Sequence, residues 1–169
     1  KRYPVDYFKK TFDVDSVYKA RLYITSCGLY EAKINGKRVG EFILAPGSTD
    51  YHKRIQYQTY DVTDLIKSGH NDLAIELADG WYRGSNGAKG RTNTFGKQTK
   101  LFAQLEICKH DGKITTICTD ETWGWSNDGP IEFADLKDGE IVNANNIPSY
   151  ENKAKVVSFY ANLTASNNV

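Results

Sequence analysis

The fold of this chain is decided by the stretch Tyr30-Glu31-Ala32-Lys33-Ile34-Asn35-Gly36-Lys37-Arg38-Val39, which reads as a β-hairpin. Apolar and polar residues alternate up to Ile34, as in a strand with one buried face. Asn35-Gly36 then supplies the two positions of positive φ that a type I′ turn requires. The pattern predicts strands over 31–34 and 37–39, joined by a tight turn that explains Asn35 without a ligand.

The same period of two recurs in other parts of the chain. Apolar residues alternate with polar ones over 18–24, 73–77 and 101–107, and each run is bounded by turn residues. The runs are short, and no amphipathic helix of useful length separates them, which favours an all-β, antiparallel β-sandwich over 1–169 as a single domain. One helical turn is expected within 61–69, with Thr63 or Asp61 as its cap and Gly69 at its end.

Two stretches resist assignment to strands. Residues 81–100 contain four glycines among polar residues, and residues 125–140 are similarly rich in turn formers. Long loops on a rigid sandwich often carry function. We therefore expect the functional groups of this chain to lie in these two loops.

Composition is typical of a globular domain and excludes some function classes. Of 169 residues, 40 % are apolar and 25 % are charged, and the formal net charge is +1. No global field therefore favours a nucleic acid or an anionic membrane as a partner. The first residues lack the apolar run of a signal peptide, and the abrupt start and the polar segment 161–169 suggest a domain excised from a larger multidomain protein.

The cysteines predict neither a zinc site nor a disulfide. Cys27, Cys108 and Cys118 contain no Cys-x-x-Cys pair. If Asp111-Gly112 is a two-residue turn, Cys108 lies opposite Thr115 and Cys118 lies opposite Leu105. The two thiols then face opposite sides of the sheet, so buried free thiols are expected.

The first candidate site is the segment Asp79-Gly80-Trp81-Tyr82-Arg83-Gly84, which directly follows a predicted strand. The Trp81 and Tyr82 rings can stack on a sugar, while Asp79 and Arg83 can form hydrogen bonds with vicinal hydroxyl groups. The alternative is structural, with both rings folded back to close the end of the sandwich and Arg83 paired with a nearby carboxylate.

The second candidate site contains Trp123, Trp125, Asn127, Asp128 and Pro130. Side-chain and carbonyl oxygens are the ligands that calcium selects, although no EF-hand spacing is present and solvated surface acids are the alternative. Further carboxylates follow at Asp135, Asp138 and Glu140. They could also form a glycosidase pair. No acid here has an environment that obviously raises its pKa, and no nucleophile has a recognisable base, so no catalytic residue is expected.

Several motifs together carry a family resemblance. They are Asn35-Gly36-Lys37-Arg38-Val39-Gly40, Leu44-Ala45-Pro46-Gly47, Asp50-Tyr51, Asp79-Gly80-Trp81-Tyr82-Arg83-Gly84, and the run from Asp128-Gly129-Pro130 through Asp138-Gly139-Glu140. In combination they resemble the N-terminal β-sandwich domain of bacterial α-L-rhamnosidases, glycoside hydrolase family 78, over about 7–143, with 151–169 as a terminal segment. The resemblance implies a jelly-roll-like, galactose-binding-like sandwich. It also implies a separate (α/α)₆ barrel that hydrolyses terminal α-L-rhamnose with inversion, so this chain by itself is not expected to be an enzyme.

The chain is also similar to carbohydrate-binding module family 67, whose members bind L-rhamnose with calcium. This similarity implies calcium ligands. Together with the interpretation of residues 79–84 as a sugar site, it also implies sugar contacts. The sugar-contact candidates are Asn35, Asp79, Trp81, Tyr82 and Arg83. The calcium candidates are Asp79, Asn127, Asp128 and the carbonyl of Pro130. Ala78 departs from the pattern, because a strong ion site would have a second acid or amide there, so calcium is possible but not required.

The resemblance leads to two alternative roles for the chain, and they predict different environments for Trp81. A module that binds or positions rhamnose-containing glycans requires Trp81 exposed in a groove. A structural domain that docks on the catalytic barrel of the same protein predicts a buried Trp81 and an exposed apolar patch. Neither role involves nucleic acid or a membrane. The resemblance implies a bacterial protein, either exported or cytoplasmic.

Overall fold

The computed structural model describes residues 2–167, so positions 1, 168 and 169 of the predicted domain lie outside the described residues. The strands of the larger sheet are β1 (Asp6–Val14), β3 (Leu29–Ile34), β4 (Lys37–Arg38), β6 (Gly69–Ala78), β9 (Gly124–Ser126) and β12 (Asn152–Lys153). The strands of the smaller sheet are β2 (Lys19–Cys27), β5 (Ile55–Asp61), β7 (Lys100–Cys108), β8 (Ile114–Cys118) and β13 (Leu163–Ala165).

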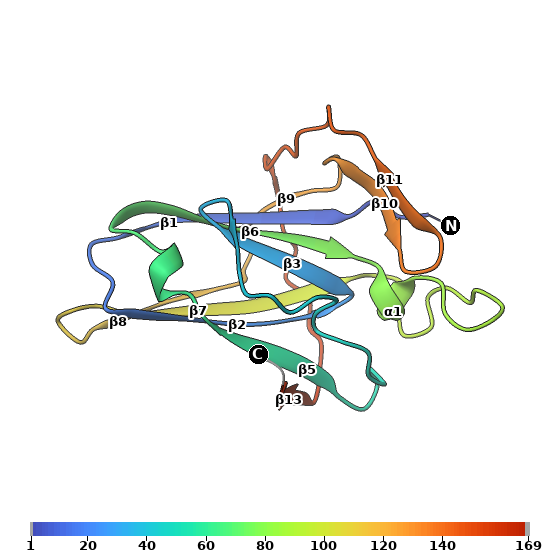
Figure 1. Cartoon of the computed structure of the whole chain (residues 1–169), viewed down its shortest axis with the longest axis horizontal. Helices are drawn as coiled ribbons and strands as arrows, with labels where there is room; N and C mark the ends of the chain where they lie inside the picture. Colours follow the sequence, from blue (N-terminus) through green and yellow to red (C-terminus); the bar gives the residue numbers. More distant parts are fainter. Residues whose placement is uncertain (1, 168–169) are drawn as a thin grey trace.

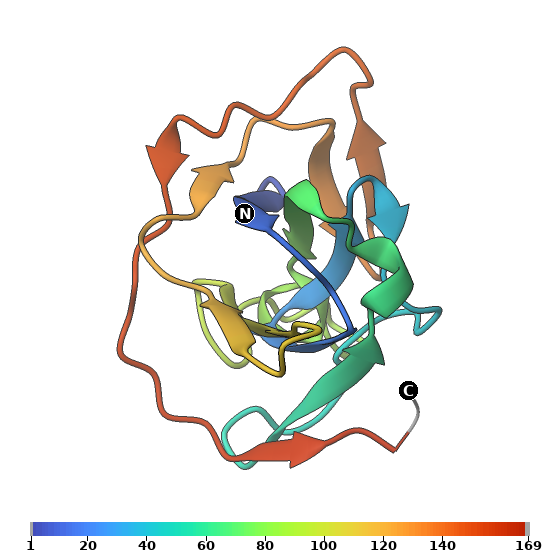
Figure 2. The same ribbon diagram turned by 90° about the vertical axis from the view of Figure 1, so that its left-hand side faces the viewer.

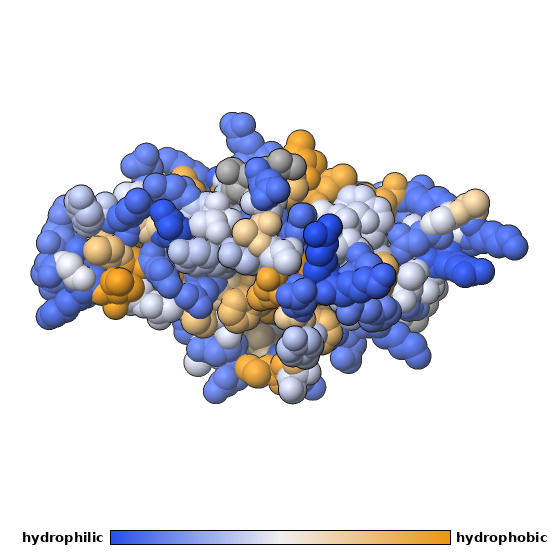
Figure 3. All heavy atoms as spheres, turned by 90° about the horizontal axis from the view of Figure 1, so that it is seen from below, coloured by the Kyte–Doolittle hydropathy of each residue, from blue (hydrophilic) through white to orange (hydrophobic). Residues whose placement is uncertain are grey.

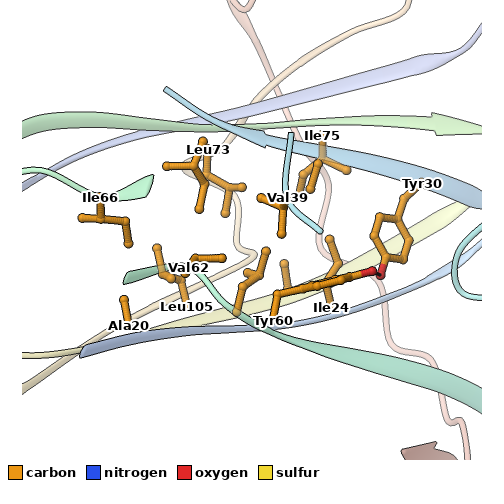
Figure 4. Close-up of a cluster of buried hydrophobic side chains, with 14 of the residues drawn as sticks. Ala20, Ile24, Tyr30, Val39, Tyr60, Val62, Ile66, Leu73, Ile75 and Leu105 are labelled. Carbon is orange, nitrogen blue, oxygen red and sulfur yellow. Dashed lines mark hydrogen bonds between the residues drawn. The ribbon is translucent and has the colours of Figure 1, made fainter. Parts of the chain in front are cut away.

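The two sheets pack face to face, and this confirms the predicted β-sandwich (Figure 1). The strand order is β12-β9-β1-β6-β3-β4 in one sheet and β13-β5-β2-β7-β8 in the other. All pairs are antiparallel except β13 with β5. The sheets cover one hydrophobic core, in which the labelled side chains of both layers point toward one another (Figure 4).

The predicted alternating runs lie in strands of this core. β2, β3, β6 and β7 cover the runs at 18–24, 30–34, 73–77 and 101–107, and their alternate residues are buried. Tyr18 and Leu101 are exceptions, because Tyr18 precedes β2 and is 65 % exposed, and Leu101 is only partly buried. The turn between β3 and β4 is the expected one, with φ of 50° at Asn35 and 78° at Gly36.

The helical turn is confirmed, but its predicted end is wrong. The 3₁₀ turn η1 (Thr63–Leu65) carries the chain from β5 in one sheet to β6 in the other. Its N-cap is Val62 rather than Thr63 or Asp61, although the Asp61 carboxylate accepts a hydrogen bond from the Thr63 amide at 3.1 Å. Gly69 does not end this turn but begins β6, where its φ of +92° suits a glycine at the entry to a strand.

The predicted register of the β7–β8 hairpin is wrong by one residue. Cys108 lies opposite Ile114, and Cys118 lies opposite Gln104. The turn is one residue longer than expected, because the Lys109 amide bonds with the Lys113 carbonyl and Gly112 adopts a φ of +82° between them. The two thiols therefore share one face of the sheet. All three cysteines are free, but only Cys27 is buried, so the prediction of buried thiols is wrong for Cys108 and Cys118, which are partly exposed.

Neither predicted loop is free of regular structure. The first contains most of helix α1 (Gly80–Arg83), and the second contains β9 and the two-stranded hairpin of β10 (Ile131–Asp135) and β11 (Gly139–Val142). These elements are only three to five residues long, too short for a periodic pattern to reveal. Within residues 2–167, no helix has the length and apolarity required to cross a membrane.

The C-terminal part of the chain wraps around the outside of the sandwich (Figure 2). After β11 it pairs briefly with β9 through β12, then crosses to the other sheet, where β13 runs parallel to β5. We call residues 143–165 the C-terminal strap. The strap follows β11 and joins the edges of both sheets.

Candidate functional site

The end of β6 places the first candidate motif at one end of the sandwich, which we call the α1 end. Asp79 follows β6 directly and caps α1, and its carbonyl accepts a hydrogen bond from the Arg83 amide at 3.1 Å. Gly80 has a φ of +51°, and a Cβ atom there would lie 2.5 Å from Leu29 Cγ. A glycine is therefore required for the chain to turn so close to the start of β3.

Asp79 and Arg83 form a buried ion pair. Arg83 Nε and Nη2 each lie 2.6 Å from Asp79 Oδ1, and the two residues are 4 % and 7 % exposed. Burial raises the pKa of the Asp79 carboxyl, which the sequence did not reveal, and the adjacent Arg83 guanidinium opposes that shift. The positive charge that this carboxylate needs is thus supplied by the protein itself.

Arg83 is held from several sides. Its guanidinium carbon lies 4.1 Å from the centre of the Tyr3 ring, and Nη2 lies 3.9 Å from the Asp6 carboxylate. Nη1 donates to the Lys97 carbonyl at 3.5 Å. Arg83 therefore ties the N-terminal strand and the loop before β7 to α1, a structural task for an arginine.

The two aromatic residues of the motif have different environments. Tyr82 is buried edge-to-face against Tyr51 at 5.2 Å, and its hydroxyl oxygen accepts a hydrogen bond from Lys100 Nζ at 3.2 Å. Trp81 is partly buried against the same cluster, which also contains Cys27 and Ile55. Tyr82 thus closes the end of the sandwich. Trp81 is neither exposed, as a sugar-binding role predicts, nor fully buried, as a structural role predicts.

Asn35 does not lie with the other sugar-contact candidates. Its side-chain oxygen accepts a hydrogen bond from the Asp72 amide at 3.0 Å, near the start of β6. Asp79 follows the end of β6, so roughly 20 Å of extended strand separates the two residues. The turn containing Asn35 therefore lies at the opposite end of the sandwich, which we call the η1 end (Figure 1).

The calcium candidates have protein partners of their own. The Asp128 carboxylate bonds with the Ser126 hydroxyl and accepts from the Ser149 amide at 3.3 Å. The Pro130 carbonyl accepts from the Asn143 amide at 2.8 Å, and Asn127 is exposed. Among the described residues, no group of three or more histidine, cysteine, aspartate or glutamate side chains is placed to hold a metal ion.

A cleft of about 830 Å³ opens beside the Asp79–Arg83 pair, between the sandwich and the C-terminal strap. We call it the edge cleft. Its floor includes Asp6, Arg83, Lys100 and Trp125, and residues 152–157 of the strap form one wall. The Asp6 carboxylate accepts hydrogen bonds from Trp125 Nε1 at 3.1 Å and from Thr99 Oγ1 at 2.5 Å.

Sequence reasoning placed Trp125 in the second candidate cluster but missed Asp6, Thr99 and Lys100. Asp6 and Trp125 are 119 positions apart in the chain and meet only because β1 pairs with β9. No local pattern reports such a contact. The cleft combines the half-buried indole of Trp125 with two carboxylates and four cationic side chains, a mixture that suits a polyhydroxylated ligand.

Comparison with known proteins agrees with the family resemblance. Residues 15–159 match the family described as "Alpha-L-rhamnosidase N-terminal domain". An α-L-rhamnosidase of Streptomyces avermitilis is 49 % identical over 128 residues, which cover 76 % of this chain and 12 % of that protein. An α-L-rhamnosidase of Formosa agariphila is 40 % identical over 139 residues, covering 82 % of this chain and 15 % of that protein.

A solved structure agrees as well. The native α-L-rhamnosidase of Aspergillus terreus superposes with a TM-score of 0.82 and 42 % identity, over 85 % of this chain and 17 % of the other. The chain therefore spans less than a fifth of the length of each of these proteins.

Proposed function

From the premise that this chain belongs to the α-L-rhamnosidase N-terminal domain family, we propose that it is a non-catalytic accessory domain of an α-L-rhamnosidase. Its role in this proposal is structural: it docks on and supports a catalytic (α/α)₆ barrel located elsewhere in the same protein. The small share of each relative that the chain spans supports an accessory role.

One observation carries the structural role. In the motif that most resembles a sugar site, the Asp79 carboxylate and the Arg83 guanidinium bind each other in a buried pair, and Tyr82 is buried beside them. A sugar hydroxyl at Asp79 would have to compete with a charge-assisted bond of 2.6 Å. The exposed apolar side chains of Ile43, Leu44 and Leu136 offer a surface on which another domain can pack.

The test compares the longer enzyme with a version that lacks residues 1–169. Loss of a supporting domain should lower the Tm of the catalytic part, while the KM for a small aryl α-L-rhamnoside changes little. The matched variant Leu44→Ser with Leu136→Ser keeps the domain but makes the packing surface polar. Unchanged Tm values in both proteins would contradict the structural role.

Glycan binding is the second candidate function, and the edge cleft is the observation that favours it. Trp125, Asp6 and Lys100 offer a stacking face, an acceptor and a donor in a space large enough for a sugar. For the longer protein, we also propose that its catalytic barrel acts with inversion. A bound calcium ion is proposed at Asp79, Asn127, Asp128 and the Pro130 carbonyl, none of which lines the edge cleft.

Calorimetric titration of L-rhamnose into the purified chain separates the two roles. Saturable heat that Trp125→Ala abolishes would establish a sugar site in the cleft. If the heat disappears with EDTA, sugar binding requires calcium. If the heat survives EDTA, sugar binding does not require calcium. No heat at tens of millimolar sugar is the result that the structural role predicts.

A further inference from the structure

The loop between α1 and β7 carries an unbalanced positive charge. Residues 84–99, which we call the basic loop, contain Lys89, Arg91 and Lys97 and no aspartate or glutamate. All three side chains are exposed. Within residues 2–167 none of the three forms an ion pair with a carboxylate.

A second basic segment lies against this loop. His52, Lys53 and Arg54 immediately precede β5 and are exposed. The ring of Phe95 in the basic loop lies 5.3 Å from the His52 ring and 5.1 Å from the Tyr51 ring, so the two segments are in contact. Lys53 is partly balanced by Asp50 at 3.5 Å, whereas Arg54 has no carboxylate partner in the described part of the chain.

The acidic residues next to the basic loop form hydrogen bonds with its first residues. The Asp135 carboxylate accepts from the Ser85 amide at 2.7 Å, and Asp138 accepts from the Ser85 hydroxyl at 3.1 Å. Lys137 Nζ donates to the Gly87 carbonyl at 2.6 Å. These bonds hold the start of the loop against the β10–β11 hairpin, and none of them involves the side chains of Lys89, Arg91 or Lys97.

The basic loop is also internally ordered. Asn86 and Arg91 exchange two backbone hydrogen bonds of 2.8 and 2.9 Å, and Asn86 Nδ2 donates to the Trp81 carbonyl at 2.7 Å. A charged surface that is already fixed loses little conformational entropy when a ligand binds. Hydrophilic side chains project from the α1 end in Figure 3, as expected for this loop.

Lysines on the larger sheet and near the η1 end have a different environment. Lys9 pairs with Asp72 at 3.4 Å, Lys33 pairs with Glu76 at 3.3 Å, and Lys109 pairs with Asp15 at 2.8 Å. Because the formal net charge of the chain is only +1, the cations of the α1 end form a local positive field rather than part of a basic protein.

We propose that Arg54, Lys89, Arg91 and Lys97 form a binding surface for an anionic polysaccharide, recognised through its carboxylate or sulfate groups. The cations are spread over two loops, which suits a chain with repeated charges better than one small anion. The half-buried Phe95 ring and the exposed His52 ring add faces on which sugar rings can stack. The choice of a glycan over another polyanion rests on glycan binding, the second candidate function above.

The test measures binding of the full chain to polygalacturonate, which carries carboxylates, and to dextran sulfate, with neutral dextran as the blank. We expect salt-dependent binding to one or both polyanions and none to neutral dextran. A triple variant that combines Lys89→Ala, Arg91→Ala and Lys97→Ala removes the three cations of the basic loop. It should weaken binding by about tenfold or more.

The matched control removes the same charge at the η1 end, through Lys19→Ala, Lys67→Ala and Lys113→Ala, which are exposed. It should keep the affinity within about twofold, because these charges lie more than a Debye length from the basic loop. Equal losses in both triple variants, no binding to either polyanion, or tighter binding to duplex DNA would each overturn the proposal. The Tm comparison tests the structural role and the rhamnose titration tests the edge cleft. Neither involves a polyanion, so a failure of either proposed role is distinguishable from a failure of this proposal.

Discussion

The side-chain amide of Asn35 donates to the side-chain oxygen of Asn71 at 2.8 Å, and this bond joins the β3–β4 turn to the start of β6. Asn35 Nδ2 also donates to the Leu65 carbonyl at 2.9 Å. Asn71 is fully buried and bonds in turn with the backbone of Lys67 and Gly69. The pair thus satisfies the backbone of the crossover between the two sheets.

Replacing Asn35 with aspartate should destabilise the fold without affecting sugar binding. The variant tolerates the positive φ of the turn, but it places an acceptor opposite the acceptors of Leu65 and Asn71. We expect the free energy of unfolding to fall by about 2 kcal/mol, measured by urea denaturation. Asn127→Asp is the matched control, since Asn127 is exposed. An altered rhamnose titration at unchanged stability would instead support Asn35 as a sugar contact.

The Asp79–Arg83 pair should be strongly coupled. Arg83→Ala leaves a buried carboxylate without its cation, and such a change costs about 3–5 kcal/mol of unfolding free energy. Asp79→Ala should cost a similar amount, and the double variant should cost less than the sum of the two. Lys97→Ala, an exposed neighbour, should change stability by less than about 0.5 kcal/mol. Additive single effects would show that the pair is not the stabilising unit.

Much of the fold could be predicted because it depends on local patterns. The alternation in β2, β3, β6 and β7 and the Asn35-Gly36 turn are properties of adjacent residues. β1 was not predicted, because Lys9 and Lys10 interrupt its apolar pattern, although Lys10 lies opposite Leu73 in the sheet. The β7–β8 register was missed because a sequence does not state whether Asp111-Gly112 is the whole turn or part of a longer one.

The candidate site was predicted less completely, for a physical reason. Residues near one another in sequence, such as Asp79 and Arg83, do meet, because one turn of helix brings positions i and i+4 together. Asp6, Thr99 and Trp125 meet through strand pairing and chain crossings that no short motif encodes. Whether a carboxylate faces solvent or an internal arginine is likewise a matter of tertiary packing.

Gly80 should tolerate no side chain. Gly80→Ala forces a Cβ to within 2.5 Å of Leu29 Cγ at a φ of +51°, so we expect a loss of about 2–4 kcal/mol in unfolding free energy. Gly90→Ala is the matched control, because its φ is +59° and no neighbouring atom lies within 4 Å. Gly90→Ala should lower the free energy of unfolding by only about 1–2 kcal/mol, which is the cost of placing a non-glycine residue at a positive φ. Equal losses at both positions would mean that the contact with Leu29 is relieved.

Asp135 should make stability depend on acid pH. Burial opposes its ionisation, but hydrogen bonds from the amides of Ser85, Lys137 and Asp138 outweigh burial and lower the pKa of the carboxyl. A folded-state pKa below the unfolded one contributes stability above the unfolded pKa of about 3.9, and that contribution is lost as the pH falls through the folded value.

Asp135→Asn should therefore lower the free energy of unfolding by about 1–2 kcal/mol at pH 7, with a smaller difference from the wild type below about pH 4. Denaturant unfolding at a series of pH values measures this difference. Asp64→Asn, which removes one negative charge at an exposed position, is the matched control for the change of charge, and it should change stability at pH 7 by less than about 0.5 kcal/mol. A difference that grows toward acid pH would contradict the assignment.

Cys27 should be the least reactive of the three thiols. Burial raises the pKa of its thiol to about 11, and the residue is 2 % exposed. A disulfide reagent at pH 8 should label Cys108 and Cys118 in the folded chain and Cys27 only after denaturation, because the thiolate is the reacting species. Cys27→Ala should retain two labelled thiols in the native state, and rapid native labelling of all three thiols would show that the α1 end opens readily.

The pairing of β13 with β5 has a consequence for solubility. Without β13, the outer edge of β5 would present unpaired backbone donors and acceptors, which are a template for pairing between molecules. The three residues of β13 cover part of that edge with a strand too short to extend a sheet far. We therefore expect the C-terminal strap to limit aggregation through the β5 edge. A chain shortened before residue 163 should precipitate at concentrations at which the full chain stays monodisperse.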